Sequence, residues 1–268
     1  MTSLKSRYEL TDLLKSILNA RNEAKWETLE SLFQPSMLID TTSQPRDAFI
    51  ANLRAASGVS VKLDSCVVDV NAQAVAGRVI KTETLPDGER YECQEIILTW
   101  FVDGRLATLK RLKDTDSRSA KQTATPSTLE ELKPTSFDLG ALYREYIKSI
   151  NDKTMEANFD KSCQLSVTHN TVEKTIAEYI SLISESQSAI QDLYFDIQDL
   201  IVDKDAGRVA ARLEFTGVPV KAWGGGEPNG KAVKFHEHVM YWLDEGKIHW
   251  VWSVVDLDTY RKQLQETD

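Results

Sequence analysis

The chain repeats part of its own sequence, and this repetition limits the fold more than any other feature. Residues 75–79, VAGRV, are matched 134 positions later by VAARL at 209–213. A spacing of 142 positions joins three further pairs: Glu95 with Glu237, Gly104–Leu106 with Gly246–Ile248, and Asp114 with Asp256. The additional eight positions fall in one hairpin connection, TLPDGER in the first copy and GVPVKAWGGGEPNGK in the second. We therefore predict a tandem duplication of one module of roughly 115 to 130 residues.

The length of 268 residues suits two domains, since domains most often contain roughly 100 to 150 residues. Between the two copies, residues 115–135 combine Ser, Thr, Lys, Asp and Pro with few apolar residues, which is typical of a linker. We predict a first domain at 1–114, a linker at 115–135 and a second domain at 136–268.

Both copies begin with the same order of expected elements. Apolar residues recur with helical spacing in the two opening segments, at Leu10, Leu13, Leu14, Ile17 and Leu18, and at Leu139, Leu142, Tyr146, Ile147 and Ile150. In the second copy, Asn170 and Glu173 have the spacing of a helix N-cap and its capping-box partner, which predicts a helix beginning there. Segments of β type follow to the end of each copy, so the sequence indicates an α+β fold.

Charge and cysteine content limit the partners and the compartment. The net charge is −9 and no Lys/Arg run could follow a phosphate backbone, so we expect no nucleic-acid partner. The three cysteines are widely spaced and without CxxC spacing, which is typical of a reduced cytoplasmic protein without a structural zinc site. The sequence shows neither a signal-peptide core nor a membrane-spanning stretch, so we expect a cytoplasmic protein without a membrane partner.

The second copy resembles the SnoaL-like polyketide cyclases between Phe137 and Leu264. The resemblance lies in His169–Asn170, VAARLEFTG, PNGKAVKF, EGKIHWVWSVVD and the pair Gln263–Leu264, in that order. It implies the cone-shaped α+β fold of ketosteroid isomerase and nuclear transport factor 2, a strongly bent antiparallel sheet wrapped around N-terminal helices and leaving a deep pocket. We expect two such cone-shaped barrels packed as an internal pseudo-dimer, which independent tumbling of the domains in small-angle scattering would contradict.

The first copy retains less of this pattern. It keeps Gly104 and Asp114, but Lys110 stands at the position of Trp252, and Asp40 lies near the place expected for His169. We interpret the first copy as a degenerate SnoaL-like domain that completes the pocket rim or the pseudo-dimer.

Asp256 is the first candidate catalytic residue. Strand alternation places Asp256 on one face with Trp250, Trp252 and Val254. A carboxylate beside two indoles would be poorly solvated, and this raises its pKa and favours proton transfer near neutral pH. The family resemblance implies an aspartate at this position acting as general acid/base. The alternative is an exposed aspartate that caps the following segment.

His169 and Asn170 form the second candidate group. An imidazole titrates near neutrality and an amide can hold a carbonyl or enolate oxygen, so we assign a catalytic role to His169 and a substrate-binding role to Asn170. A packed structural role for His169 and helix capping for Asn170 are the alternatives.

His236 and His238 lie two apart on an expected strand and share a face, whereas Glu237 points to the other face with Phe235 and Tyr241. Two histidines could bind a metal ion, but no third ligand is identifiable, so we expect no metal. We predict a catalytic role for His238 and a substrate-binding role for His236. Arg212, repeated as Arg78, could hold an anionic ligand group or cover the sheet with its stem.

Four aromatic residues complete the substrate-binding candidates, namely Tyr146, Trp223, Trp250 and Trp252. A core position is the alternative for aromatic residues at helical spacing. The run Gly224–Gly226 lacks the context of a phosphate loop, so we expect a flexible hairpin loop at the pocket mouth.

These features predict a cofactor-independent general acid/base enzyme, either a cyclase, an isomerase or a dehydratase. Its substrate would be a small, largely apolar secondary metabolite such as a polyketide or terpenoid. The alternative is a non-catalytic protein that uses the same pocket to bind a small ligand or to act as a scaffold. A homo-oligomer is compatible with either function.

Overall fold

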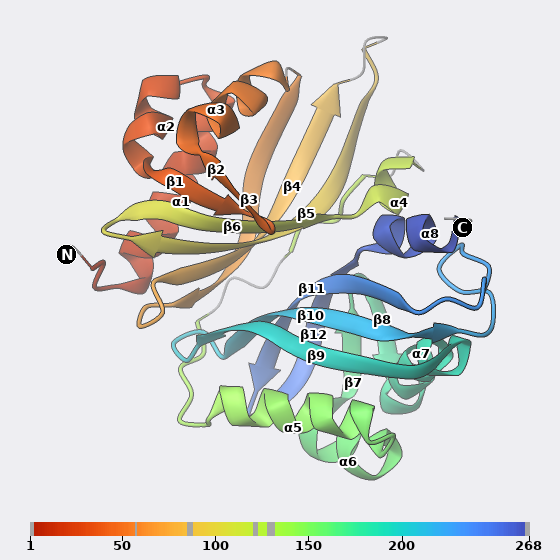
Figure 1. Ribbon diagram of the computed structural model, residues 1–268. Coiled ribbons are helices and arrows are strands. Elements are labelled where there is room, and N and C mark those ends of the chain that lie inside the picture. Colours follow the sequence, from red (N-terminus) through yellow and green to blue (C-terminus); the bar gives the residue numbers. More distant parts are fainter. Residues whose placement is uncertain (1–2, 57, 85–87, 120–122, 128–131, 266–268) are drawn as a thin grey trace. The chain divides into compact units, whose positions relative to one another are not determined.

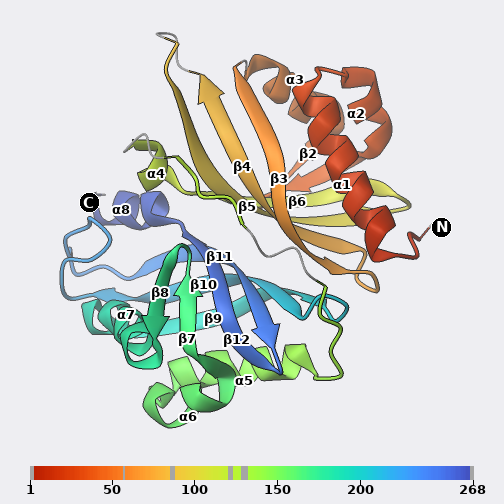
Figure 2. The ribbon, with the colours of Figure 1, turned by 180° about the vertical axis from the view of Figure 1, so that it is seen from behind.

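The two copies fold into domains with the same succession of helices and strands (Figures 1 and 2). The computed structural model describes residues 3–56, 58–84, 88–119, 123–127 and 132–265. It divides into two units, Met1–Glu130 and Glu131–Asp268. The predicted duplication is therefore visible in the order of the elements.

Each domain contains two helices, a short hairpin, a third helix, four long strands and a final helix. The first consists of α1 (Arg7–Asn22), α2 (Trp26–Leu32), β1 (Phe33–Ile39), β2 (Thr42–Pro45), α3 (Arg46–Ala55), β3 (Val59–Asp69), β4 (Ala74–Thr84), β5 (Arg90–Val102), β6 (Arg105–Lys113) and α4 (Thr115–Ser119). The second consists of α5 (Leu139–Asn151), α6 (Met155–Ser162), β7 (Cys163–His169), β8 (Val172–Thr175), α7 (Ile176–Ala189), β9 (Ile190–Asp203), β10 (Arg208–Pro219), β11 (Val233–Asp244), β12 (Lys247–Val255) and α8 (Leu257–Gln265).

Each domain has one six-stranded sheet, ordered β2-β1-β6-β5-β4-β3 in the first and β8-β7-β12-β11-β10-β9 in the second. The sheets are mixed and not purely antiparallel as expected, because β1 pairs parallel with β6 and β7 pairs parallel with β12. Parallel pairing needs a long connection, and here the third helix and the intervening strands supply it. Figure 1 shows α1, α2 and α3 on one side of the first sheet.

Bulges and tight turns recur at corresponding positions of the two sheets. A bulge leaves Asp64 of β3 unpaired opposite β4, and another leaves Gln198 of β9 unpaired opposite β10. Such bulges bend a strand and increase its twist. The β5–β6 and β11–β12 turns place Gly104 and Gly246 at φ +70° and +76°, which explains why glycine recurs at this point of the repeat.

One asparagine in each copy fastens the first helix to the sheet. Asn22 at the end of α1 donates to the Val61 carbonyl at 2.7 Å and accepts from the Val61 N–H at 2.9 Å. Asn151 at the end of α5 makes the same pair of bonds with Phe195, both at 2.9 Å. The two asparagines are therefore equivalent.

Asn151→Ala should lower the free energy of unfolding by about 1–3 kcal/mol, because both backbone groups of Phe195 lose a partly buried partner. Urea unfolding of the variant would measure the loss. Asn158→Ala is a suitable control, since the Asn158 amide makes exposed bonds to Thr154 within α6. Equal stability of the two variants would contradict a role for Asn151 in fastening the helix.

Helix α7 begins later than predicted from Asn170 and Glu173. Thr175 is the N-cap, accepting from the Glu178 N–H at 3.3 Å, while the Glu178 carboxylate accepts from the Thr175 N–H at 2.8 Å. Asn170 occupies the turn between β7 and β8 with φ +53°. The predicted capping box at Asn170 is wrong, because the β7–β8 hairpin continues to Thr175 and α7 begins only after it, with Thr175 and Glu178 as its capping box.

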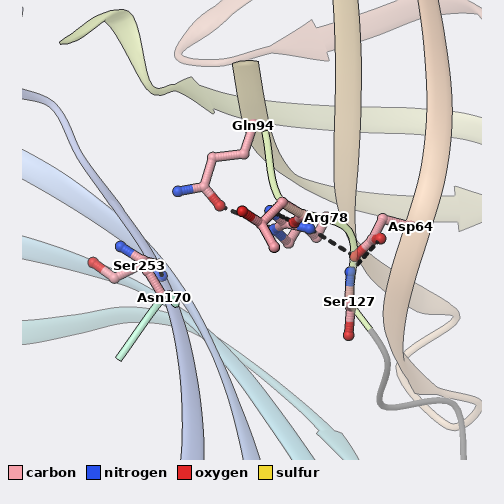
Figure 3. A network of polar contacts seen from close by, with 7 residues as sticks. Asp64, Arg78, Gln94, Ser127, Asn170 and Ser253 are labelled. Atoms are coloured by element: carbon pink, nitrogen blue, oxygen red, sulfur yellow. Dashed lines mark hydrogen bonds and ion pairs between the residues drawn. The ribbon is translucent and has the colours of Figure 1, made fainter. Parts of the chain in front are cut away.

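Part of the segment expected as a linker belongs to the first domain. It contains α4, and Thr125 and Ser127 bond to the buried pair formed by Arg78 and Asp64 (Figure 3). Arg78 is 1% exposed and donates to Asp64 at 2.8 Å, to the Gln94 side chain at 2.9 Å and to the Thr125 carbonyl at 2.7 Å. Such complete pairing indicates a structural role for Arg78.

Candidate active site

The second domain encloses a cavity of about 160 Å³ between its helices and one face of its sheet. Helices α5 and α7 and strands β9 to β12 line it mainly with apolar and aromatic side chains. These include Ile147, Ile150, Leu182, Ile183, Phe195, Leu213, Phe215, Tyr241, Val251 and Val255.

Glu237 of β11 places a carboxylate in this cavity. The Ser253 hydroxyl of β12 donates to it at 2.5 Å, and no ion pair of Glu237 occurs among the described residues. Burial raises the pKa of Glu237 to about 7, while the hydrogen bond from Ser253 acts in the opposite direction. A carboxyl group with this pKa can both take and give a proton near neutral pH.

Three tyrosines share the cavity lining with Glu237. The Tyr146 and Tyr179 hydroxyls are 2.8 Å apart, and the Tyr146 and Tyr241 rings are 5.7 Å apart. Burial raises the pKa of all three well above the ordinary value, so they remain neutral hydroxyl groups. Because one hydroxyl of a bonded pair can still donate outward, Tyr146 and Tyr179 can offer a hydrogen bond to a ligand.

His169, at the end of β7, lines the cavity beside Tyr179, with ring centroids 6.1 Å apart. Burial, and to a lesser extent Lys174, lowers the pKa of His169 to about 4. At neutral pH the His169 ring is therefore uncharged. It can donate or accept a hydrogen bond, but it does not become protonated and so does not act as an acid or base.

Asn170 acts on the site through Ser253. Its side-chain oxygen accepts from the Ser253 N–H at 2.9 Å, and the two residues lie next to each other in Figure 3. Since the Ser253 hydroxyl bonds Glu237, Asn170 fixes the strand that carries the partner of the carboxylate. The amide lies outside the cavity lining described above.

Residues 140–264 match the family model described as SnoaL-like polyketide cyclase. The second domain belongs to this family. No curated protein matches the chain significantly.

Three solved structures illustrate the similarity, and each aligns with about half of this chain. A SnoaL-like polyketide cyclase from Agrobacterium tumefaciens is 32% identical, with 47% of this chain and 97% of that chain covered and a TM-score of 0.44. TsrD from Streptomyces laurentii is 20% identical, with 50% and 98% covered and a TM-score of 0.44. AclR from Streptomyces galilaeus is 19% identical, with 49% and 98% covered and a TM-score of 0.42.

Asp256 lies outside the cavity of the SnoaL-like domain. Its carboxylate accepts from the Thr259 N–H at 3.1 Å and so caps α8, and the residue is half-buried. Asp256 directly follows the last residue of β12, whereas Ser253 lies within the strand and lines the cavity. The cavity lies on the face that carries Val251, Ser253 and Val255.

The histidines of β11 face away from the cavity for the same reason. Arg212 donates to Nε2 of His238 at 2.7 Å, and His238 is completely buried. Nε2 of His236 lies 3.4 Å from Glu214, and burial lowers the pKa of His236. The lining of the SnoaL-like domain therefore contains their neighbour Glu237 and not the histidines.

The aromatic candidates divide between the two faces. Tyr146 and Trp223 line the cavity of the SnoaL-like domain. Trp223 comes from the long β10–β11 connection, whose Gly226 forms an isolated bridge with it. Trp250 and Trp252 contact each other with ring centroids 5.6 Å apart and lie outside the lining.

The sequence analysis did not select Glu237, although its carboxylate lines the cavity. Two signals were available, since Glu95 repeats it in the first copy and a carboxylate between Phe235 and Tyr241 interrupts an apolar strand face. The first domain, which we expected to be degenerate, retains a cavity of about 290 Å³ lined by Glu95.

Within the described parts of the chain, no three His, Cys, Asp or Glu side chains gather as a group that could hold a metal ion. None of the helices in these parts has both the length and the apolar character needed to cross a membrane.

Proposed function

We propose that the SnoaL-like domain is a cofactor-independent general acid/base enzyme in which Glu237 transfers the proton. The observation that carries the proposal is a carboxyl group with a pKa of about 7 that faces an apolar cavity and accepts a hydrogen bond from the Ser253 side chain. A group whose pKa matches the working pH is the most effective proton shuttle.

In the first step, the Glu237 carboxylate removes a proton from a carbon next to a carbonyl group. The electron pair of the broken C–H bond moves into the carbonyl, which becomes an enolate oxyanion. The hydroxyl pair of Tyr146 and Tyr179 is suited to donate a hydrogen bond to this oxyanion, and His169 offers a second uncharged donor.

The second step determines the product. Return of the proton from Glu237 to a different carbon is an isomerisation. Attack of the enolate carbon on a second carbonyl, followed by protonation of the alkoxide, is a cyclisation. Loss of a hydroxyl group that takes the proton from Glu237 and leaves as water is a dehydration. All three reactions share the first step and need only one carboxyl group.

The volume and the lining of the cavity favour a small, largely apolar substrate. A volume of about 160 Å³ is close to the roughly 150 Å³ of an engineered apolar cavity that binds benzene. The lining accordingly accommodates one ring or a short chain of a polyketide or terpenoid metabolite.

Turnover of 5-nitrobenzisoxazole should increase with pH, with a midpoint near the pKa of about 7 of Glu237. In this reaction a base removes the ring C–H proton, the N–O bond breaks and a cyanophenolate forms, so only a base is required. Ser253→Ala should move the midpoint to higher pH, because the hydrogen bond from Ser253 favours the carboxylate. Initial rates followed by phenolate absorbance give both profiles.

A rate that does not depend on pH across neutrality would contradict the proposal. If the compound binds but is not converted at any pH, the domain is better described as a small-ligand-binding protein.

A further inference from the structure

Arg21 brings a charge into the first cavity at a position where the second cavity is apolar. Asn22 and Asn151 make the same pair of hydrogen bonds to their sheets, so the residues that precede them, Arg21 and Ile150, are equivalent. Both residues line their cavities.

At two further positions, the first cavity has a cationic side chain where the second has an uncharged one. Arg111 and Ser253 are equivalent. The Arg111 N–H donates to the side chain of Asp40, which follows β1, at 2.8 Å, and the Ser253 N–H donates to that of Asn170, which follows β7, at 2.9 Å. Lys81 and Phe215 each lie two residues after the repeated segments VAGRV and VAARL. Three uncharged positions of the second cavity are therefore occupied by cations in the first.

Arg21 has an unused donor inside the protein. Its Nη1 atom is buried and has no hydrogen-bond partner among the described residues. A buried guanidinium N–H without an acceptor is unfavourable, so an acceptor supplied by a ligand would stabilise it. Burial lowers the pKa of Arg21, the nearby carboxylate of Glu95 opposes this shift, and Arg111 adds a smaller lowering.

The other two cations have partners outside the lining. Arg111 donates to Asp40 at 2.9 Å, and Nζ of Lys81 lies 2.7 Å from Glu83. These ion pairs hold the two cations in place beside the cavity, and Arg111 remains partly exposed.

Glu95 is the acidic residue of the lining and offsets only part of this charge. Burial raises the pKa of Glu95, and nearby cations oppose the shift. These cations are Arg111, Lys81, Lys113 and Arg21. The rest of the lining is mainly apolar and includes Leu14, Ile17, Phe33, Phe49, Leu53 and Val61.

We propose that the cavity of the first domain binds an organic anion with one carboxylate group and an apolar body, with Arg21 and Arg111 holding the carboxylate. Two guanidinium groups can bind a carboxylate through several charge-assisted hydrogen bonds. The volume of about 290 Å³ is near the lower end, roughly 300 Å³, of small-molecule pockets. This site is independent of the reaction proposed for Glu237.

Isothermal titration calorimetry of the full chain with octanoate and with octanamide tests the site. Octanoate should bind at least about tenfold more tightly than the uncharged amide, because only the carboxylate is a charged acceptor. Arg21→Met should weaken octanoate binding at least about tenfold and remove most of the preference over octanamide. Ile150→Met, the equivalent change in the second cavity, should leave octanoate binding unaltered.

Arg111→Ser, which introduces the residue of the second cavity, provides a second variant if Arg21→Met does not fold. It should also weaken octanoate binding. Equal affinities for octanoate and octanamide, absence of octanoate binding at millimolar concentration, or full binding by a folded Arg21 or Arg111 variant would each overturn the proposal.

Discussion

Glu237→Gln should reduce turnover of 5-nitrobenzisoxazole by about 10²- to 10⁴-fold, the usual contribution of a general base. The amide has nearly the same shape as the carboxylate but cannot accept the proton, and it can still accept the hydrogen bond from Ser253. Initial rates at a pH above 7, where the wild-type carboxylate is ionised, give the largest difference.

Asp256→Asn is the matched control for this experiment. Asparagine caps helices as well as aspartate does, so the cap on Thr259 should persist and turnover should stay close to that of the wild type. Loss of activity in the Asp256 variant together with full activity in the Glu237 variant would place the chemistry on the opposite face of the sheet and overturn our assignment.

The stability of the Glu237→Gln variant separates lost chemistry from lost structure. The folded-state pKa of about 7 lies above the ordinary value of 4.5, so the folded protein binds this proton more tightly than the unfolded chain. The corresponding contribution to stability is present below about pH 4.5 and is lost as the pH rises through about 7. Above that pH the amide should therefore be at least as stable as the ionised carboxylate, which urea unfolding can verify.

Arg78→Met should lower the free energy of unfolding of the first domain by about 3–5 kcal/mol. Arg78 and Asp64 are 1% and 6% exposed, so removal of the guanidinium leaves a buried carboxylate without its charge partner. The substitution also removes the bonds to Gln94 and to the Thr125 carbonyl. Calorimetric unfolding should show the effect in one of two transitions if the domains unfold separately.

A double-variant cycle identifies the cause of this loss. Asp64→Asn removes the charge but can still accept from the Ser127 N–H, which lies 2.7 Å from the carboxylate. Adding Asp64→Asn to Arg78→Met should recover a large part of the lost stability, since no unpaired charge remains. If Arg78→Met alone costs less than about 1 kcal/mol, the network does not have the structural role that we assign to it.

The duplication and the order of elements could be predicted because they depend on local patterns. Helical spacing locates α1 and α5, and the recurrent Gly104 and Gly246 mark turns that need positive φ angles. The longer connection of the second copy also lies where the repeat placed it, between β10 and β11.

The site could be predicted only in part, because period-2 alternation tells which residues share a face and not which face meets the cavity. Asp256, Trp250 and Trp252 lie outside the cavity lining, because helices α5 and α7 cover the other face, where Glu237 and Ser253 lie. That choice depends on contacts between residues far apart in the chain, such as Asn151 with Phe195. No local pattern contains them.

The fusion of both copies into a single polypeptide has an evolutionary consequence. In an assembly of identical subunits, any mutation that places an arginine in one cavity places it in every cavity. Here a mutation at Arg21 leaves Ile150 unchanged. The ligand preference of one cavity can therefore change while that of the other cavity is retained. Covalent linkage also produces the two cavities in a fixed one-to-one ratio.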